Sequence, residues 1–363
     1  MKKILQILGA LDVGGAETMV MNIYRNIDKK TLNFDFVVSG EREGYYEKEI
    51  NAGESKVFHI KERSESLKEH LFDLYRIVKK NDYDVIHYHT ENSFLAFCDL
   101  LVCKIAGARK LVVHSHNTMD YRGGLLVVLS RIFRVPLRLI ANSKLSCGEE
   151  AAIWLYGTNK NVEIIPLPVD CKKYEYSLNK QNDLKRKYSL DDKIVYAHVG
   201  SFSKVKNQLF LLDVFYEIYK LNQNSHLILV GDGEYRDRIE RKIKELELQK
   251  AVTLFGIVDD VYNKLVLSDC FIFPSLFEGF PTVVLEAQAA GLPCFVSDTV
   301  TNKIDITKCV SFVSLNMSAK DWANKIVRNK SYDCKKRREL NKIVAKTYDI
   351  SSVVKVINDV YGV

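Results

Sequence analysis

The sequence predicts an α/β protein of two domains, each a parallel β-sheet covered by helices. Short apolar runs suited to buried strands alternate with amphipathic helical patterns in both halves of the chain, which is typical of parallel sheets. Between the halves, Pro166 and Pro168 impose a stiff, extended path and end the first alternating series. The length of 363 residues fits two domains of moderate size. We therefore place the boundary directly after Pro168.

Composition and charge restrict the class of protein. The chain is 47% hydrophobic and 27% charged, as expected for a globular protein with a sizeable core. No apolar run reaches the roughly 18 residues that span a bilayer, and nothing at the start resembles a signal peptide, so we expect a cytoplasmic protein. The eight cysteines form no CxxC pair and indicate reduced thiols. The excess of 53 basic over 46 acidic residues is too mild for nucleic-acid binding, but it suits an anionic ligand or a lipid surface.

A strand is expected at residues 3–11 and a helix from about Ala16. The helix carries an apolar stripe at Met19, Val20, Ile23 and Ile27. Gly14 and Gly15 lie between these elements, where glycines let the backbone approach a ligand and the helix start favours phosphate. A tight turn that needs glycine for its backbone angles is the alternative. The turn matches neither the GK[ST] ending of a phosphate-binding loop nor GxGxxG.

Strands and helices alternate through the rest of the first half. We expect strands at 33–40, 56–60, 84–90, 110–118 and 138–143, and helices at 70–80, 95–107 and around Trp154. In such sheets ligands bind outside the carboxyl ends of the strands. The literal DxD motif at Asp82–Asp84 precedes a strand, and we interpret it as a solvated turn.

Two pairs of histidines lie at the ends of neighbouring strands, His87 with His89 and His114 with His116. Alternate residues of a strand share a face, so each pair can project two imidazoles in one direction. Four clustered histidines suggest zinc, but no carboxylate or cysteine completes the ligand spacing. We favour hydrogen-bonding or charge-stabilising histidines and expect no metal.

Residues 121–140 interleave apolar side chains with basic ones, at Arg122, Arg131, Arg134 and Arg138. The pattern is that of a basic amphipathic segment, which can contact an anionic membrane surface. A helix packed on the sheet with arginines at its rim gives the same pattern. Both interpretations remain open from the sequence.

The second half repeats the alternation. We expect a short helix at 184–190, strands at 193–199, 226–231 and 252–258, helices at 207–220, 236–247 and 262–270, and helical structure from 321 onward. Lys206 lies near the start of the helix at 207–220, where an ammonium beside free backbone N–H groups suits a diphosphate. A solvated basic loop that includes Lys204 is the alternative.

The stretch at 271–298 combines a buried strand, a loop containing Glu278, a helix containing Glu286, and a further short strand. Glu286 follows Glu278 by about two helical turns. The helix start between them can hold an anion or an oxygen-rich ligand. An ordinary strand-loop-helix with two exposed glutamates is the alternative.

Seven motifs in this order resemble glycosyltransferase family 4, of the kind that builds bacterial capsular or exopolysaccharides. They are GGAE at 14–17, HSHN at 114–117, VD at 169–170, VGSFSKVKNQ at 199–208, VGDGE at 230–234, FGIVDDV at 255–261 and EGFPTVVLE at 278–286. The resemblance covers almost the whole chain. It implies the GT-B fold, with two Rossmann-like domains facing across a cleft: an acceptor domain at 1–168, a donor domain at 169–348, and a last helix at 349–363 that returns to the first domain.

The resemblance also implies roles for single residues. Glu286 would bind the ribose hydroxyls, Lys206 would neutralise the diphosphate, and His116 would lie beside the transferred sugar. Glu278, Gly279, Phe280, Pro281 and Thr282 would hold the sugar and phosphates, with Gly14, Gly15, Gly256, Val258 and Ser201 completing the donor site. Similar enzymes usually carry arginine where this chain has Ser201, and serine cannot replace arginine's bidentate fork.

The predicted activity is transfer of a sugar from a nucleotide-diphosphate sugar, expected to be a UDP-sugar, with retention at the anomeric carbon. The acceptor is expected to be a saccharide or lipid-linked saccharide at the inner face of the plasma membrane. The resemblance implies no cofactor and no metal. A sugar-nucleotide epimerase of the same fold and a non-catalytic sugar-nucleotide-binding protein remain alternatives; Ser201 motivates the second.

Overall fold

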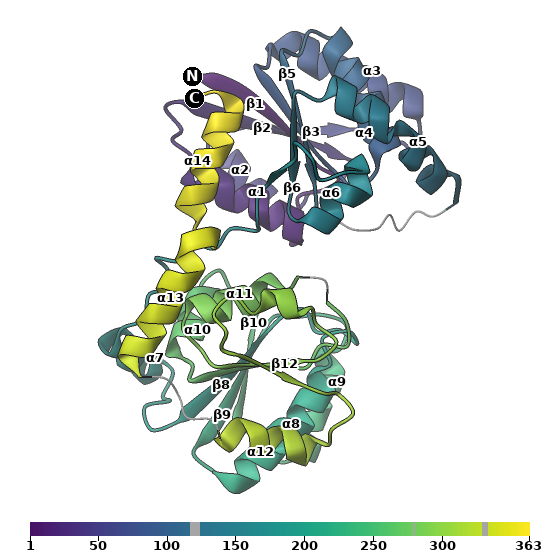
Figure 1. The fold of residues 1–363 in the computed structure, drawn as a ribbon. Coiled ribbons are helices and arrows are strands. Elements are labelled where there is room, and N and C mark those ends of the chain that lie inside the picture. Colours follow the sequence, from purple (N-terminus) through teal and green to yellow (C-terminus); the bar gives the residue numbers. More distant parts are fainter. Residues whose placement is uncertain (117–123, 279, 329–332) are drawn as a thin grey trace. The chain divides into compact units, whose positions relative to one another are not determined.

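The computed structural model describes residues 1–116, 124–278, 280–328 and 333–363. The chain forms two compact units, each a parallel sheet with helices on both faces (Figure 1). The first unit contains Met1–Pro168 and Ile350–Val363, and the second contains Val169–Asp349. The boundaries expected from the sequence lie after Pro168 and after Tyr348.

The first unit is built on a seven-stranded sheet in the order β3-β2-β1-β4-β5-β6-β7. Its strands are β1 (Lys2–Ile7), β2 (Leu32–Ser39), β3 (Val57–Ile60), β4 (Val85–Thr90), β5 (Lys110–Ser115), β6 (Ser143–Ser146) and β7 (Glu163–Ile164). Neighbouring residues face opposite sides, so that Ile4 lies in one core cluster and Leu5 in the other. Burial on both faces explains why these strands read as continuous apolar runs.

In the described part of the chain, seven helices cover this sheet. They are α1 (Gly15–Asn26), α2 (Glu47–Asn51), α3 (Leu67–Asn81), α4 (Ser93–Ile105), α5 (Gly124–Ile140), α6 (Glu149–Tyr156) and α14 (Ile350–Tyr361). The last helix completes the first unit's core, where the Tyr361 ring meets Phe34 with 5.9 Å between ring centroids. Lys2 Nζ donates to the Tyr361 carbonyl at 2.9 Å, so the first strand and the last helix are joined directly. No helix within the described residues is long and apolar enough to cross a membrane.

The second unit has a six-stranded sheet in the order β10-β9-β8-β11-β12-β13. Its strands are β8 (Ile194–Val199), β9 (Ser225–Val230), β10 (Val252–Gly256), β11 (Cys270–Phe273), β12 (Cys294–Ser297) and β13 (Val310–Val313). The helices are α7 (Leu178–Lys187), α8 (Gln208–Leu221), α9 (Arg236–Glu245), α10 (Val261–Leu267), α11 (Thr282–Ala289), α12 (Ala319–Arg328) and α13 (Cys334–Tyr348), with a short 3₁₀ turn, η1, at Asn302–Ile304.

The structure differs from the sequence analysis at several places. The strand expected at 138–143 is wrong at its start, because Leu137 and Ile140 are buried at helical spacing and α5 continues to Ile140. The helix expected at 184–190 begins earlier, at Leu178, after Ser177 caps it by accepting from the Lys180 N–H at 3.2 Å. Strand β13 was not expected at all, since its four residues give too short a pattern.

The turn at Asp82–Asp84 is ion-paired as well as exposed. Asp82 and Asp84 both accept hydrogen bonds from Arg109, at 3.0 and 2.9 Å, and Tyr83 between them is buried and donates to Asp35 at 2.8 Å. The prediction of a solvated turn is therefore wrong for Tyr83. These carboxylates lie before β4, at the end of the sheet opposite the carboxyl ends of the strands.

Candidate functional site

Each sheet contains one point at which the strand order reverses. In the second unit the chain runs outward from β8 to β10, returns to β11 beside β8, and continues outward to β13. Loops that follow two such neighbouring strands diverge to opposite faces and leave a crevice where ligands bind in open α/β sheets. The loops after β8 and β11 carry Lys206 and Glu278.

Lys206 and Glu278 form an ion pair at this switch point. Lys206 Nζ lies 2.5 Å from Glu278 Oε1, and their side chains are 19% and 17% exposed. Asn207, in the left-handed conformation at φ 57°, begins α8 and donates to the Pro274 carbonyl at 3.1 Å, which ties the two loops together. Ser275 Oγ donates to the same Glu278 oxygen at 3.3 Å. Lys206 is therefore not in a solvated loop, although its neighbour Lys204 is exposed.

Glu286 lies in the second turn of α11 and is partly buried. Burial raises the pKa of its carboxyl to about 7, and a hydrogen bond with Tyr174 opposes that rise. No side chain caps the start of α11, so the first backbone N–H groups beside Thr282 remain available to an anion. Neither glutamate of this stretch is an exposed surface residue, which removes that alternative.

Buried polar groups form hydrogen bonds with the backbone of the loop after β8. Gln208, at the start of α8, donates to the Ser201 carbonyl at 2.8 Å and lies 3.3 Å from His198 Nε2. His198 Nδ1 lies 3.0 Å from the Ile272 carbonyl, so this nitrogen carries the proton. The Ser201 side chain itself is exposed. The loop thus has a fixed backbone and an open side-chain position at Ser201, where the family resemblance led us to expect arginine.

Glycines let the chain pack tightly beside this loop. A Cβ on Gly231 would lie 2.1 Å from the Gly200 carbonyl oxygen, and one on Gly233 would lie 2.5 Å from the Phe202 oxygen. Both have positive φ, at 132° and 156°. The VGDGE motif therefore has a packing explanation that needs no ligand. Gly256 is the last residue of β10, and the partly buried Val258 belongs to the loop that follows it.

At the start of α1, Gly14 has φ −129°, an ordinary extended conformation, so the tight-turn explanation for this glycine is wrong. A Cβ there would lie 2.3 Å from the Glu17 carboxylate, whereas one on Gly15 would meet nothing within 4 Å. The Glu17 side chain is flexible and can move away, so neither space nor backbone angles require glycine at Gly14, and Gly15 leaves the helix start open.

The four histidines of the first unit cluster as expected from their strands. The ring centroids of His87 and His89 are 4.2 Å apart, as are those of His114 and His116. His89 Nδ1 lies 2.8 Å from His116 Nε2, and His89 Nε2 lies 2.9 Å from Gln6 Oε1. Because the Gln6 oxygen only accepts, His89 carries its proton on Nε2 and accepts from His116 at Nδ1.

This chain of hydrogen bonds determines the tautomer of His116. Its Nε2 donates to His89, and within the described residues its buried Nδ1 has no hydrogen-bond partner. Burial lowers the pKa of His116 to about 4, so the ring is neutral at physiological pH. A neutral hydrogen-bonding group fits better than a charge-stabilising imidazolium.

One nitrogen from each of His87, His89 and His114 lies within 4.8 Å of the others, close enough to consider a metal ion. His89 already uses both nitrogens, for Gln6 and His116. His87 Nδ1 is taken by the Tyr361 hydroxyl at 2.6 Å. His87 Nε2 and both nitrogens of His114 have no hydrogen-bond partner within the described residues, so the histidines form a hydrogen-bonded network only in part.

Comparisons with known proteins identify the family. The family model described as Glycosyltransferase Family 4 matches residues 13–173, and that described as Glycosyl transferases group 1 matches residues 180–347. The chain is a group 1/family 4 glycosyltransferase. EpsF of Bacillus subtilis, which is named as a glycosyltransferase, is 29% identical to it over 100% of this chain and 97% of that protein.

Two further proteins are similar to this glycosyltransferase. The UDP-Gal:α-D-GlcNAc-diphosphoundecaprenol α-1,3-galactosyltransferase of Escherichia coli is 29% identical over 71% of this chain and 74% of its own. HepE of Anabaena, solved in complex with UDP-glucose, has a TM-score of 0.75 and 17% identity over the full length of both chains. The likeness confirms the predicted GT-B fold.

The structure brings Lys206 and Glu278 together, with Phe280, Pro281, Thr282 and Glu286 following on the same loop and helix. His116, Gly14 and Gly15 belong to the first unit. Gly279, Asn117 and Arg122 lie outside the described residues. Sequence reasoning missed Tyr174, Gln208 and Ser275, whose contacts hold Glu286, Ser201 and Glu278. Two of them carried a signal, because Ser275 lies beside the paired-glutamate motif and Gln208 ends the VGSFSKVKNQ motif at 199–208.

Proposed function

We propose that this glycosyltransferase moves a sugar from a UDP-sugar to a saccharide or lipid-linked saccharide in bacterial surface polysaccharide biosynthesis, with retention at the anomeric carbon. The single observation that carries the proposal is the Lys206–Glu278 pair at the β8/β11 switch point. The UDP-glucose bound to HepE and the UDP-Gal in the name of the E. coli relative support UDP as the nucleotide. Diphosphoundecaprenol in that same name supports a lipid-linked acceptor.

In the proposed mechanism the leaving diphosphate takes the place of Glu278 as the partner of Lys206. Negative charge grows on the leaving group as the anomeric bond breaks, and a preorganised cation stabilises it most in the transition state. The uncapped start of α11 at Thr282 adds backbone N–H donors to the same charge. Glu278, freed from Lys206, can then accept hydrogen bonds from the sugar hydroxyls.

Glu286 and His116 bind the two ends of the donor in this proposal. A carboxylate accepts from both ribose hydroxyls at once, which suits Glu286. The bare Nδ1 of His116 accepts from a hydroxyl of the transferred sugar. The acceptor attacks from the face that the diphosphate leaves, and its proton passes to the departing phosphate, so no separate base is needed.

The functional test measures release of UDP from UDP-glucose, UDP-galactose and their N-acetylated analogues, with and without acceptor. Thermal shift identifies the nucleotide first, because a ligand that binds only the folded state stabilises it. Epimerisation of the donor without acceptor would favour the epimerase alternative. Donor binding with no transfer, restored by Ser201→Arg, would favour the non-catalytic alternative.

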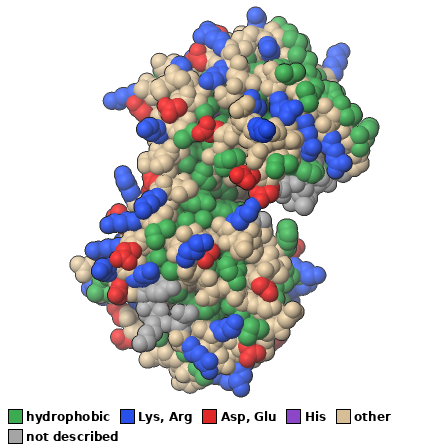
Figure 2. Space-filling model, in the orientation of Figure 1, with side chains coloured by type: hydrophobic (Ala, Val, Ile, Leu, Met, Phe, Trp, Pro, Cys, Tyr) green, Lys and Arg blue, Asp and Glu red, His purple; other side chains and the backbone are tan. Residues whose placement is uncertain are grey.

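A lipid-linked acceptor requires contact with a membrane, and α5 has a surface suited to it. Its exposed apolar side chains recur at helical spacing, at Leu125, Val128, Ile132, Val135 and Leu139. Figure 2 shows apolar side chains interspersed with basic ones along this side of the first unit. Arg131 is exposed, whereas Arg134 is bonded through Nε and Nη2 to the Trp154 carbonyl at 3.0 and 2.7 Å. We propose that the apolar stripe and Arg131 dock on an anionic bilayer.

Ile132→Ser with Leu139→Ser should reduce binding to anionic vesicles by about ten-fold or more, since each lost apolar side chain removes roughly 1.5 kcal/mol of burial. Arg131→Glu should reduce it by about five- to ten-fold. Co-sedimentation with vesicles measures both. Leu178→Ser, at a 55% exposed leucine of α7, is the matched control and should change nothing. Equal vesicle binding by all variants would remove the membrane surface from the proposal.

A further inference from the structure

A small cavity lies at the switch point of the first unit, where β4 returns beside β1. Gly9, which follows β1, Ser39 at the end of β2 and Thr90 at the end of β4 contribute to its lining, together with Arg63 from the loop after β3. Its volume is about 80 Å³. At roughly 10–15 Å³ for each water, that is space for about six water-sized atoms, close to one phosphate and too little for a sugar ring.

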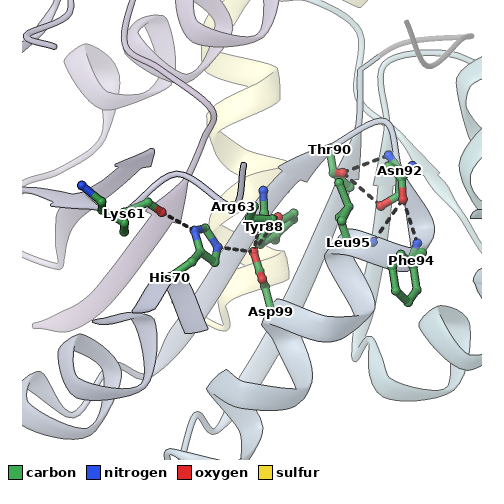
Figure 3. Close-up of polar contacts among 9 residues, drawn as sticks. All are labelled: Lys61, Arg63, His70, Tyr88, Thr90, Asn92, Phe94, Leu95 and Asp99. Atoms are coloured by element: carbon green, nitrogen blue, oxygen red, sulfur yellow. Dashed lines mark hydrogen bonds and ion pairs between the residues drawn. The ribbon is translucent and has the colours of Figure 1, made fainter. Parts of the chain in front are cut away.

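A buried ionic cluster lies directly beside the cavity (Figure 3). Arg63 Nη2 donates to the Tyr88 hydroxyl at 2.7 Å and to Asp99 Oδ2, and the Tyr88 hydroxyl donates to Asp99 at 2.8 Å. The Asp99 side chain is only 1% exposed. Burial alone would raise its pKa, but His70 and Arg63 hold the pKa of Asp99 below its usual value. Asp99 is therefore a buried carboxylate.

His70 also contacts this cluster. Its Nδ1 lies 2.8 Å from the Lys61 carbonyl oxygen, which only accepts, so Nδ1 carries a proton (Figure 3). Its Nε2 lies 3.4 Å from Asp99 Oδ2. The Arg63 guanidinium is therefore the cation that Asp99 balances directly.

Arg63 has a buried donor, Nε, that no described residue satisfies. Its hydrogen bonds to described residues come from Nη2. The side chain is 24% exposed and lines the cavity. Burial would lower the pKa of Arg63, but Tyr88 and Asp99 raise it further, so the group stays charged. A guanidinium fixed on one side and open on the other suits bidentate binding of an oxyanion.

We infer that this cavity binds one compact oxyanion carried by the acceptor, either a phosphate of a lipid diphosphate or the carboxylate of an acidic sugar. The inference rests on the proposed function, because it assigns the site to the acceptor. Glu91 lines the same cavity and opposes an incoming anion. Arg63 and Glu91 therefore have opposite effects on affinity.

Isothermal titration of the full chain, with UDP present in excess to occupy the donor site, tests this with inorganic pyrophosphate as the probe. Arg63→Gln should weaken binding at least ten-fold, and Glu91→Gln should strengthen it several-fold. Arg109→Gln is the matched control and should bind as the unmodified chain does. Arg109 is 61% exposed and pairs with Asp82 and Asp84 at the opposite end of the sheet.

Ser39→Asp keeps the buried cluster intact and places a carboxylate in the cavity, so it should abolish binding even if Arg63→Gln fails to fold. Farnesyl diphosphate and glucuronate are further probes that distinguish the two sources of the oxyanion. Tighter binding of farnesyl diphosphate identifies a lipid diphosphate, and tighter binding of glucuronate identifies an acidic sugar. No binding of any probe, or unchanged binding in Ser39→Asp, overturns the inference. A separate UDP-glucose titration reports on the donor site, so failure of the proposed function is recognised independently.

Discussion

Lys206 and Glu278 at the switch point of the second unit keep 19% and 17% of their side chains exposed, whereas Asp99 at that of the first keeps 1%. Both sites follow from the same strand order, in which the fourth strand returns beside the first. The partly buried Lys206–Glu278 pair can exchange one partner for a ligand, because both charges keep some contact with solvent. The buried Asp99 carboxylate cannot exchange its partner for a ligand, and it instead fixes the orientation of Arg63. One topology therefore supports an exchangeable charge pair and a permanent counter-ion.

The largest effect expected from this difference is on stability. Asp99→Asn should lower the free energy of unfolding by about 3–5 kcal/mol, because it leaves the mostly buried Arg63 guanidinium without its counter-charge. Glu278→Gln should cost about 1 kcal/mol or less, since Lys206 gains water in exchange. Urea unfolding measures both, and Asp82→Asn at the exposed turn is the control. An equal loss of unfolding free energy in Asp99→Asn and Glu278→Gln would contradict the proposed difference between the two sites.

The exchangeable pair should matter for turnover. Lys206→Ala should reduce UDP release in the presence of acceptor by about 100- to 1,000-fold, the usual cost of removing one group that stabilises developing negative charge. Lys204→Ala, two residues earlier in the same loop and exposed, should change the rate by less than about three-fold. A Lys206→Ala variant with normal turnover would show that the pair is structural.

The pH dependence of donor binding tests Glu286. Burial favours its protonated form, so the carboxyl loses its proton only as pH rises through about 7, and a neutral carboxyl cannot accept from both ribose hydroxyls. Affinity for UDP-glucose should therefore increase about ten-fold between pH 6 and pH 8. Glu286→Gln should bind more weakly and lose this dependence. A wild-type affinity that is flat with pH would contradict the ribose assignment.

The smallest effect is expected at Ser201. Ser201→Arg places a guanidinium on an exposed, backbone-fixed loop position and should improve donor affinity about three- to ten-fold, worth roughly 1 kcal/mol. Ser203→Arg in the same loop is the control and should give no improvement. A loss of affinity in Ser201→Arg would mean that the serine is preferred by this donor site.

Both sheets and most of their elements could be predicted from periodicity, because strands buried on two faces and amphipathic helices leave strong patterns. The ends of the helices and strands were harder to predict. Leu137 and Ile140 are residue types that occur in buried strands and in buried helix faces alike. Only their packing in α5 shows that this segment is helical. The four residues of β13 form a strand because they pair with β12. The local sequence gives no sign of this pairing.

The candidate site was predictable to a similar extent. Motif order placed Lys206, Glu278 and Glu286 in one unit, but it gave no indication that the first two pair directly. The hydrogen bonds that Tyr174 and Gln208 make in this site could not be predicted, because a tyrosine or an amide has no spacing in the sequence that reveals its partner. The Arg63–Asp99 cluster was missed for the same reason: its members come from separate segments and meet only through the fold.

The contacts of α14 have a consequence for the order in which the protein is made. Tyr361 lies in the core of the first unit and bonds to Gln6 and His87, yet it is synthesised after the whole of the second unit. The second unit is one continuous segment, Val169–Asp349, and has all its residues before that point. The half of the chain that is synthesised first is thus the half that finishes folding last.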